Sequence, residues 1–231
     1  KMPGDFRISQ NWIGGSSLAS AKFIPPNYRY IDELMGDVER FIHNESNNVP
    51  HLIKIAILHY QFETIHPFLD GNGRVGRLLI TLYLVGQGIL NKPALYLSDY
   101  LERNRDEYYS HLTAIREKNQ IIPWIKFFLK GIISTATNAK ETFIKIIQLQ
   151  KDMEVKLHSF GTKSEKINTI LNSFYDTPIL SVKDIVTRTG IADKTTRNMI
   201  ELMLEEGLIK EMTGYGRNKL FIFEKYFNLF K

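Results

Sequence analysis

The chain has 231 residues, which is long enough for one large domain or for a large domain and a small one. Its 43% hydrophobic and 24% charged residues are typical of a globular protein, and no apolar run approaches the ~20 residues of a membrane span. The absence of cysteine excludes disulfides and cysteine-ligated zinc and fits a reducing compartment, so we expect a cytoplasmic protein with no membrane partner. A net charge of +5 permits an anionic ligand or a nucleic acid as a partner without requiring either.

The first thirty residues show no helical pattern. Two short apolar segments, 12–13 and 21–24, flank the turn-forming sequence Gly14-Gly15-Ser16-Ser17 and predict a β-hairpin over about residues 12–25. The segment Lys1-Met2-Pro3-Gly4-Asp5 has no apolar signal region, and because the chain begins with lysine we expect the natural protein to extend upstream.

Two helices follow the hairpin. Apolar residues at helical spacing predict the first over about residues 31–42 and the second over about residues 50–66, where the next residue is a proline that disfavours helical geometry. His51 and His59 lie on the second helix without a third ligand at metal spacing, so we expect them to be structural or exposed.

A glycine-rich charged stretch comes next, and it carries the chemistry of the chain. It has the sequence His66-Pro67-Phe68-Leu69-Asp70-Gly71-Asn72-Gly73-Arg74-Val75-Gly76-Arg77. A carboxylate for a metal, N–H groups at a helix start and two arginines suit a polyphosphate, and the histidine can accept a proton. Taken alone, the Asp-Gly-Asn-Gly sequence is also a good turn, and the arginines fit an exposed face.

The helix after this stretch begins at about Arg74 and is apolar on nearly every side, so we expect it to be buried in the domain centre. Further helices are predicted over about residues 98–118 and from Pro123 to about His158. The chain from 1 to 159 is therefore predicted to be an all-helical domain with one hairpin, followed by a short linker.

Residues 160–231 predict a second, small domain. Helical patterns near 167–174, 181–189 and 193–206 precede two extended segments around a glycine-containing turn. Helix, helix-turn-helix and hairpin in this order are typical of a winged helix.

The glycine-rich stretch resembles the signature of the Fic family, His-x-Phe-x-Asp/Glu-Gly-Asn-Gly-Arg-x-x-Arg, and matches it at every fixed position. The resemblance covers about residues 6–135. Trp12-Ile13-Gly14-Gly15 and Phe23-Ile24-Pro25-Pro26 resemble the hairpin that precedes the Fic core, and Leu97-Ser98, Asn104-Arg105 and Tyr108-Tyr109 resemble the segment downstream.

The resemblance implies a Fic-type all-α core with a β-hairpin flap and a specific reaction. That reaction is the Mg²⁺-dependent transfer of AMP from ATP to a serine, threonine or tyrosine hydroxyl of a protein, called AMPylation, with self-modification included. His66 would accept the hydroxyl proton, and Asp70 would hold Mg²⁺. The flap, about Ile13–Phe23, would bind the target as an added strand.

The resemblance also implies the nucleotide contacts. The backbone N–H groups of Gly71, Asn72 and Gly73 would bind phosphate, with the Asn72 side chain as a further donor, and Arg74 and Arg77 would clamp the β- and γ-phosphates. Asn104 and Tyr108 would contact ribose or adenine, and core packing is an equal alternative for Tyr108.

Several alternatives stay open at this point. The two loop glycines favour AMP transfer over phosphoryl transfer, whereas phosphocholine transfer, AMP removal, the target and the oligomeric state are not decided by the sequence. The string Ser/Thr-x-x-x-Glu-Gly/Asn of the family's inhibitory helix is absent from these residues, and we expect it upstream.

A second class of function is a DNA-binding transcriptional regulator in which the Fic core acts as a sensor. It would use the start of the third helix of the small domain, residues 194–198, and Arg217 and Lys219 in the wing. Residues 160–231 carry a net charge of only +2, which is weak support for a nucleic-acid partner, so a docking or regulatory role is favoured.

Overall fold

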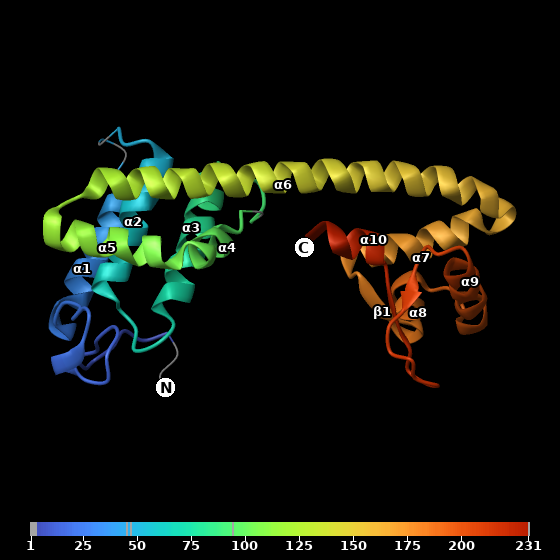
Figure 1. Cartoon of the computed structure of the whole chain (residues 1–231), viewed down its shortest axis with the longest axis horizontal. Helices are drawn as coiled ribbons and strands as arrows, with labels where there is room; N and C mark the ends of the chain where they lie inside the picture. The colour runs from blue at the N-terminus through green and yellow to red at the C-terminus, as the bar shows by residue number, and fades with distance from the viewer. Residues whose placement is uncertain (1–3, 45, 47, 94, 231) are drawn as a thin grey trace. The chain divides into compact units, whose positions relative to one another are not determined.

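The structure is a computed structural model that describes residues 4–44, 46, 48–93 and 95–230, and it divides into two compact units (Figure 1). The units are Lys1–Ala139 and Lys140–Lys231, so the division lies earlier than the predicted boundary at 159/160. The reason is the long helix α6 (Ile121–Leu157), whose last turns contribute Met153 and Leu157 to the core of the second unit.

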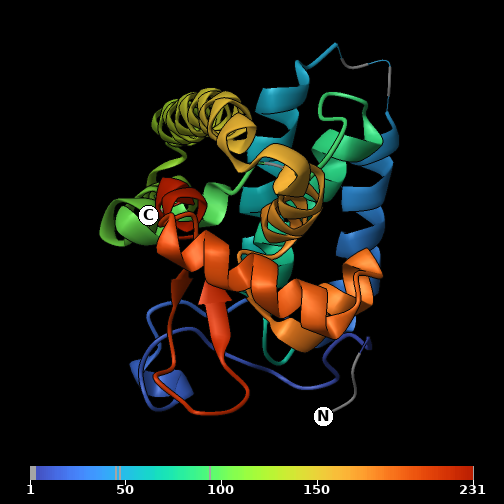
Figure 2. The ribbon, with the colours of Figure 1, turned by 90° about the vertical axis from the view of Figure 1, so that its right-hand side faces the viewer.

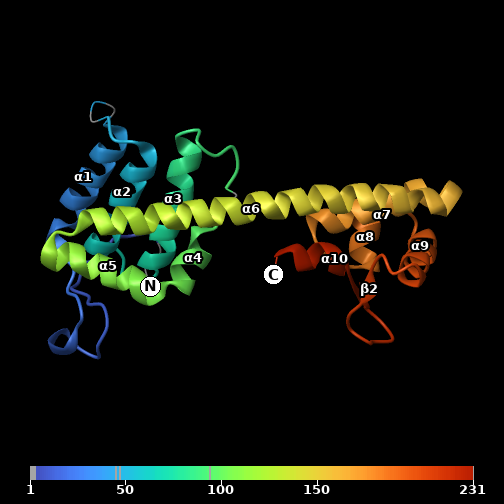
Figure 3. The same ribbon diagram turned by 45° about the horizontal axis from the view of Figure 1, so that its top comes forward.

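The first unit is built from helices. They are α1 (Ile31–His43), α2 (His51–Ile65), α3 (Asn72–Gly86), α4 (Leu97–Arg103), α5 (Arg105–Lys118) and the first part of α6. Trp124 of α6 is fully buried and donates a hydrogen bond from its indole nitrogen to Ala56 O of α2 at 2.9 Å, and α6 crosses α2 in both views (Figure 1 and Figure 3). The predicted helices at 31–42, 50–66 and 123–158 are confirmed, the last as one uninterrupted helix.

The predicted helix over 98–118 is wrong in one respect, because it is two helices that meet at Asn104. The backbone N–H and the side-chain Nδ2 of Asn104 both donate to Tyr100 O, at 3.1 and 2.8 Å. An asparagine that bonds to nearby backbone in this way competes with the regular helix.

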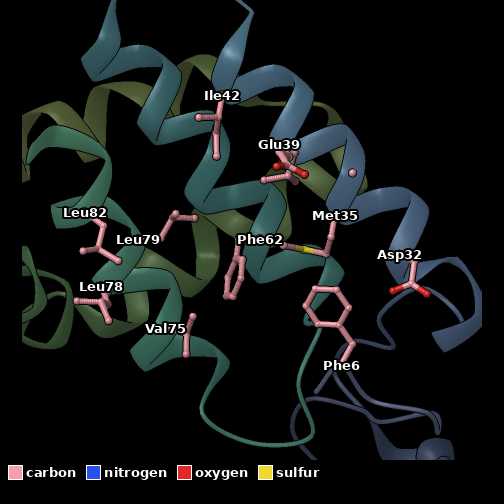
Figure 4. A pocket seen from close by; sticks show the side chains of 12 residues that line it. Phe6, Asp32, Met35, Glu39, Ile42, Phe62, Val75, Leu78, Leu79 and Leu82 are labelled. Atoms are coloured by element: carbon pink, nitrogen blue, oxygen red, sulfur yellow. The ribbon is translucent and has the colours of Figure 1, made fainter. Parts of the chain in front are cut away.

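The expectation that α3 is buried on nearly every side is also wrong. Val75, Leu78 and Leu82 are 38%, 55% and 59% exposed. They line one side of an apolar groove whose other side is helix α1, with Phe62 of α2 between them (Figure 4). The face of α3 that does face the core presents Gly76, Ile80, Tyr83 and Leu84.

The predicted hairpin near residues 12–25 is reduced to a single antiparallel bridge. Ile13 N donates to Phe23 O at 2.9 Å and Phe23 N donates to Ile13 O at 3.2 Å. The tip between them contains a short 3₁₀ turn, Leu18–Ser20. The expected pairing is therefore present, but regular strands are not formed among the described residues of this segment.

The second unit combines helices with a small sheet (Figure 2). Its main elements are α7 (Ser164–Asp176), β1 (Ile179–Ser181), α8 (Val182–Thr189), α9 (Asp193–Glu205), β2 (Lys210–Glu211) and β3 (Leu220–Ile222). The strands are antiparallel in the order β1-β3-β2, and α10 (Glu224–Phe227) follows them. The sequence predicted the three helices and two strands but missed β1, which is only three residues long.

Two short 3₁₀ segments, Tyr28–Tyr30 before α1 and His158–Lys163 after α6, and a last one, Asn228–Phe230, complete the elements. The predicted linker after residue 159 lies in the second of these. Helices dominate both units, as expected, and within the described ranges no helix has the length and apolarity that crossing a membrane requires.

Candidate active site

The loop between α2 and α3 begins with His66 in a left-handed backbone conformation, at φ 51° and ψ 59°. Its N–H donates to Phe62 O at 2.9 Å and so closes helix α2. A positive φ is uncommon for any residue other than glycine and costs free energy that the surroundings must supply. The helix ends where the proline predicted it, and the strained turn directs the histidine out of the helical path.

The buried guanidinium of Arg7 holds this strained turn in place. Only 3% of Arg7 is exposed, and its Nε donates to His66 O at 2.9 Å. Its Nη2 donates to Pro26 O at 2.5 Å and its backbone N–H donates to Pro67 O at 2.8 Å. One arginine therefore ties the loop to the segment that ends the flap.

The next part of the loop is fixed by Phe68. Its ring packs against Phe6 and Phe62, with centroid distances of 5.6 and 6.3 Å. Its carbonyl accepts hydrogen bonds from Asn11 Nδ2 at 3.1 Å and from Asn72 Nδ2 at 2.7 Å. These contacts make Phe68 an anchor of the loop.

Helix α3 starts at Asn72, and Gly71 before it has a φ of 85°, a conformation that favours glycine. Asn72 is buried, and its side chain both accepts from Phe68 N at 2.8 Å and donates to Phe68 O. The amide therefore closes the loop onto the helix start. This contact with Phe68 differs from the predicted use of the Asn72 side chain as a phosphate donor.

Asp70 and Arg74 lie on the exposed side of the helix start. Arg74 Nη2 is 3.7 Å from Asp70 Oδ2, and both side chains are largely exposed. In the described residues no group of three or more acidic or histidine side chains forms a ready metal cage. One carboxylate near the start of a helix still fits the expectation of Mg²⁺, which takes one or two carboxylates together with phosphate oxygens and water.

Arg77 lies one turn further along α3, beside the buried carboxylate of Glu63 from α2. A Cβ built on Gly73 would be 3.2 Å from Arg77 Nη1 and 3.9 Å from Glu63 Oε1, so both groups lie against the same glycine. Burial raises the pKa of Glu63 to about 7, and the charges of Arg77 and Arg116 oppose that shift. Glu63 Oε1 has no hydrogen-bond partner among the described residues.

The pKa of His66 is lowered from its ordinary value, chiefly because the ring is partly buried. The Glu63 carbonyl acts in the opposite direction, and the positive charges of Arg7 and Arg116 add to the lowering. The imidazole is therefore neutral at pH 7 and free to accept a proton, which is what a general base requires.

The two downstream candidates have different surroundings. Asn104 is half-buried at the junction of α4 and α5. Tyr108 is buried, with its hydroxyl 3.0 Å from His59 Nε2 and its ring against Trp124. The structure therefore places Tyr108 in the core, which corresponds to the packing alternative. His59 is fully buried and structural, as predicted, since its Nδ1 lies 3.0 Å from Gly76 O.

Sequence reasoning missed Arg7 and Glu63. A single arginine in a non-helical segment carries no sequence signal for the four carbonyl groups that it contacts. Glu63 gave a weak signal, because it is a charged residue next to Phe62 on the inner side of a largely apolar helix.

The nucleic-acid candidates of the second unit are less available than predicted. Thr196 is fully buried and donates to Ile191 O at 3.2 Å. Arg197 Nε and Nη2 are 2.6 and 3.1 Å from the two carboxylate oxygens of Asp193. The exposed Lys183, Arg217 and Lys219 do line a common hollow with Arg197, but Asp193 and Glu201 line it as well.

Comparison with known proteins supports the resemblance drawn from the loop. Residues 1–84, which include the whole glycine-rich stretch, match the model of the Fic/DOC family. The chain is 33% identical over 125 residues to Protein adenylyltransferase Fic of Drosophila melanogaster, and this match covers 54% of the chain and 23% of that protein. It is 39% identical over 119 residues to a probable protein adenylyltransferase of Aquifex aeolicus (strain VF5), covering 52% of the chain and 32% of that protein.

The chain thus spans about a quarter to a third of the length of these curated relatives. Its fold is similar to the crystal structure of a Fic family protein from Desulfovibrio desulfuricans G20, with a TM-score of 0.53 and 22% identity. That similarity covers 96% of this chain and 63% of the other, and at this identity it concerns the fold alone.

Proposed function

We propose that the first unit transfers AMP from ATP to a hydroxyl group of a protein target. The observation that carries the proposal is that a neutral histidine and the N-terminus of a helix lie in the same loop. His66 is held by the left-handed turn and by Arg7, and α3 begins within the same loop, with Arg74 and Arg77 in its first turns. The similarity to two adenylyltransferases over about half of the chain points to the same reaction.

In this mechanism His66 accepts the proton of the target hydroxyl while the hydroxyl oxygen attacks the α-phosphorus of ATP. A new P–O bond forms, the bond to the pyrophosphate oxygen breaks in line with it, and pyrophosphate leaves. Because the pKa of His66 lies below its ordinary value, the imidazole is already in the basic form at pH 7.

The phosphates would lie at the start of α3. The N–H groups of Gly71, Asn72 and Gly73 lack helical partners there and carry the positive end of the helix dipole. Arg74 and Arg77 would bind the β- and γ-phosphates through their planar guanidinium groups. Asp70 is the residue that would hold Mg²⁺, which neutralises charge on the phosphate oxygens when bound.

The contacts to the protein target and to the nucleoside are proposed from the positions of the residues in the structure. The segment Ile13–Phe23 would bind the target, because backbone paired at a bridge can take an added strand from a second chain. Asn104 remains the proposed contact to the nucleoside, whereas Tyr108 is assigned to holding His59.

The proposal is tested with the whole chain, Mg²⁺, a cell lysate and ATP labelled at the α-phosphate. Wild type should label protein, and His66→Ala should slow labelling by at least ~100-fold, the usual contribution of a general base. His51→Ala is the matched control, since this second histidine lies at the opposite end of α2 and contacts Tyr83. Equal labelling by wild type and His66→Ala would contradict the proposal.

For the second unit we propose a winged-helix arrangement with a docking or regulatory role. The element order α7, β1, α8, α9, β2, β3 and the sheet order β1-β3-β2 support the arrangement. The Asp193 partner of Arg197 weakens the DNA-binding alternative. Salt-sensitive, sequence-specific DNA binding without any AMP transfer would instead favour the regulator.

A further inference from the structure

Arg116 of α5 joins the flap to the interior of the candidate active site. Its guanidinium carbon lies 3.7 Å from the ring centroid of Phe23, which is a close cation–π distance. Phe23 is also the residue that pairs with Ile13 in the bridge of the flap. The arginine therefore contacts the flap at the point where its two arms are held together.

The other side of Arg116 faces the site. Its Nε is buried and has no hydrogen-bond partner in the part of the chain that the structure describes. Its positive charge lowers the pKa of both His66 and Glu63, so the guanidinium is electrically coupled to the base and to the buried carboxylate. None of the reaction steps proposed for His66, Asp70, Arg74 and Arg77 involves this half-buried cation.

We propose that Arg116 is a positioning residue that fixes Phe23, and with it the flap, at the edge of the site around His66. This inference rests on the proposed function, because the flap matters for catalysis only if it holds a protein target. A target strand that pairs with the flap is positioned by the bridge between Ile13 and Phe23. A flap that moves relative to His66 would therefore misplace the attacking hydroxyl.

An arginine suits this task because its planar group can lie flat on an aromatic ring while it keeps its charge. A lysine would keep the charge but not the flat contact. The two properties can therefore be separated by substitution, and each has its own measurable consequence.

The test uses Arg116→Met, which removes both charge and stacking, and Arg116→Lys, which removes mainly the stacking. Arg105→Met is the matched control, because Arg105 lies on the same helix and its guanidinium is 5.7 Å from the ring centroid of Tyr109 instead of a ring of the flap. Thermal unfolding of each variant checks that the first unit remains folded.

The first measurement is hydrogen exchange of the Ile13 and Phe23 amides that form the bridge. Exchange should become several-fold faster in Arg116→Met and Arg116→Lys and stay unchanged in Arg105→Met. The second is the titration of the His66 ring by NMR. Its pKa should rise in Arg116→Met and stay near the wild-type value in Arg116→Lys.

The third measurement is the initial rate of protein labelling from α-labelled ATP, at varied lysate concentration and at varied ATP. The apparent KM for lysate protein should rise ~3–30-fold in Arg116→Met, the range expected for a lost cation–π contact, and by a smaller factor in Arg116→Lys, with the KM for ATP unchanged. Phe23→Leu should reproduce the change in KM without the change in the His66 titration.

Unchanged bridge exchange in Arg116→Met would overturn the inference, and so would faster exchange with no effect on the KM for lysate protein. A wild-type chain that labels nothing would contradict the proposed function instead, since exchange and titration report on Arg116 without any activity.

Discussion

The carboxylate of Glu63 lies directly against Gly76 of the next helix. A Cβ built on Gly76 would come within 2.5 Å of Glu63 Oε1 and 3.1 Å of the Phe62 ring, so this position of α3 has no room for a side chain. The contact sets how closely α2 and α3 approach, and these two helices carry the ends of the loop that contains the candidate site.

We predict that Gly76→Ala destabilises the first unit by ~1–3 kcal/mol, because overpacking at a buried contact outweighs the ~1 kcal/mol that alanine gains over glycine in a helix. Gly86→Ala, at the end of the same helix, is the control: nothing lies within 4 Å of its Cβ, so it should be neutral or stabilising. Urea unfolding followed by tryptophan fluorescence measures both. A Gly76→Ala variant as stable as Gly86→Ala would contradict the close packing.

The raised pKa of Glu63 leads to a prediction about how the stability of the first unit depends on pH. A carboxyl group whose pKa rises to about 7 on folding favours the folded state fully below pH 4.5, and that stability is lost as the pH rises through 7. Glu63→Gln should therefore increase the free energy of unfolding by ~1–3 kcal/mol at pH 8 and much less at pH 5. A variant that is less stable than wild type at pH 8 would show that the ionised carboxylate is well paired.

The lowered pKa of His59 predicts the opposite pH dependence of stability, a loss as the pH falls. Burial lowers its pKa to about 4, so the folded state keeps the ring neutral while the unfolded state takes up a proton below about 6.5. Wild type should lose ~3 kcal/mol of stability from this group between pH 6.5 and pH 4. In Glu63→Gln this loss should stand out clearly, because the compensating change of Glu63 over the same range is absent.

The lowered pKa of His66 leads to a prediction about how the rate of AMP transfer depends on pH. The rate of AMP transfer at saturating ATP should be independent of pH near 7 and should fall only below pH 6.5, as the base becomes protonated. Removal of a nearby positive charge should move this acid limb to higher pH. An acid limb above pH 7 in the wild type would contradict the neutral histidine.

Arg7 makes a prediction about the loop. Arg7→Met should leave the carbonyls of His66 and Pro26 without their donor, at a cost of ~2–4 kcal/mol for buried groups that lose hydrogen bonds to a charge. It should also lower the rate of transfer more than the affinity for ATP, because the backbone of the base is released. Arg29→Met, an exposed arginine near the same segment, should do neither. A change in stability without any change in rate would restrict Arg7 to a structural role.

The helices could be predicted from the sequence because their apolar residues recur at helical spacing, as in α1 and α2. The exposed face of α3 could not, because Val75, Leu78 and Leu82 have no property that distinguishes a groove from a core. The break at Asn104 depends on one side-chain contact to Tyr100, which spacing does not encode. The division at 139/140 depends on which core the end of α6 packs into.

The candidate site, like the fold, could be predicted only in part from the sequence. His66, Asp70 and the two arginines could be identified from the sequence of the loop, because those residue types at that spacing match a family signature. The sequence did not reveal the groups around them, since Arg7 contacts the backbone carbonyl of His66 and Arg116 contacts the ring of Phe23 from distant parts of the chain. Asn72 was recognised as part of the site, but its side-chain contact to Phe68 became evident only in three dimensions.

The central claim is that His66 drives the transfer of AMP, and the position of the label on ATP tests it most directly. Wild type and His66→Ala are incubated with Mg²⁺ and lysate, once with ATP labelled at the α-phosphate and once with ATP labelled at the γ-phosphate. We predict that the difference between the two proteins appears only with the α label and is released as AMP on hydrolysis of the modified protein. A difference that appears with the γ label, or no difference with either, would contradict the account.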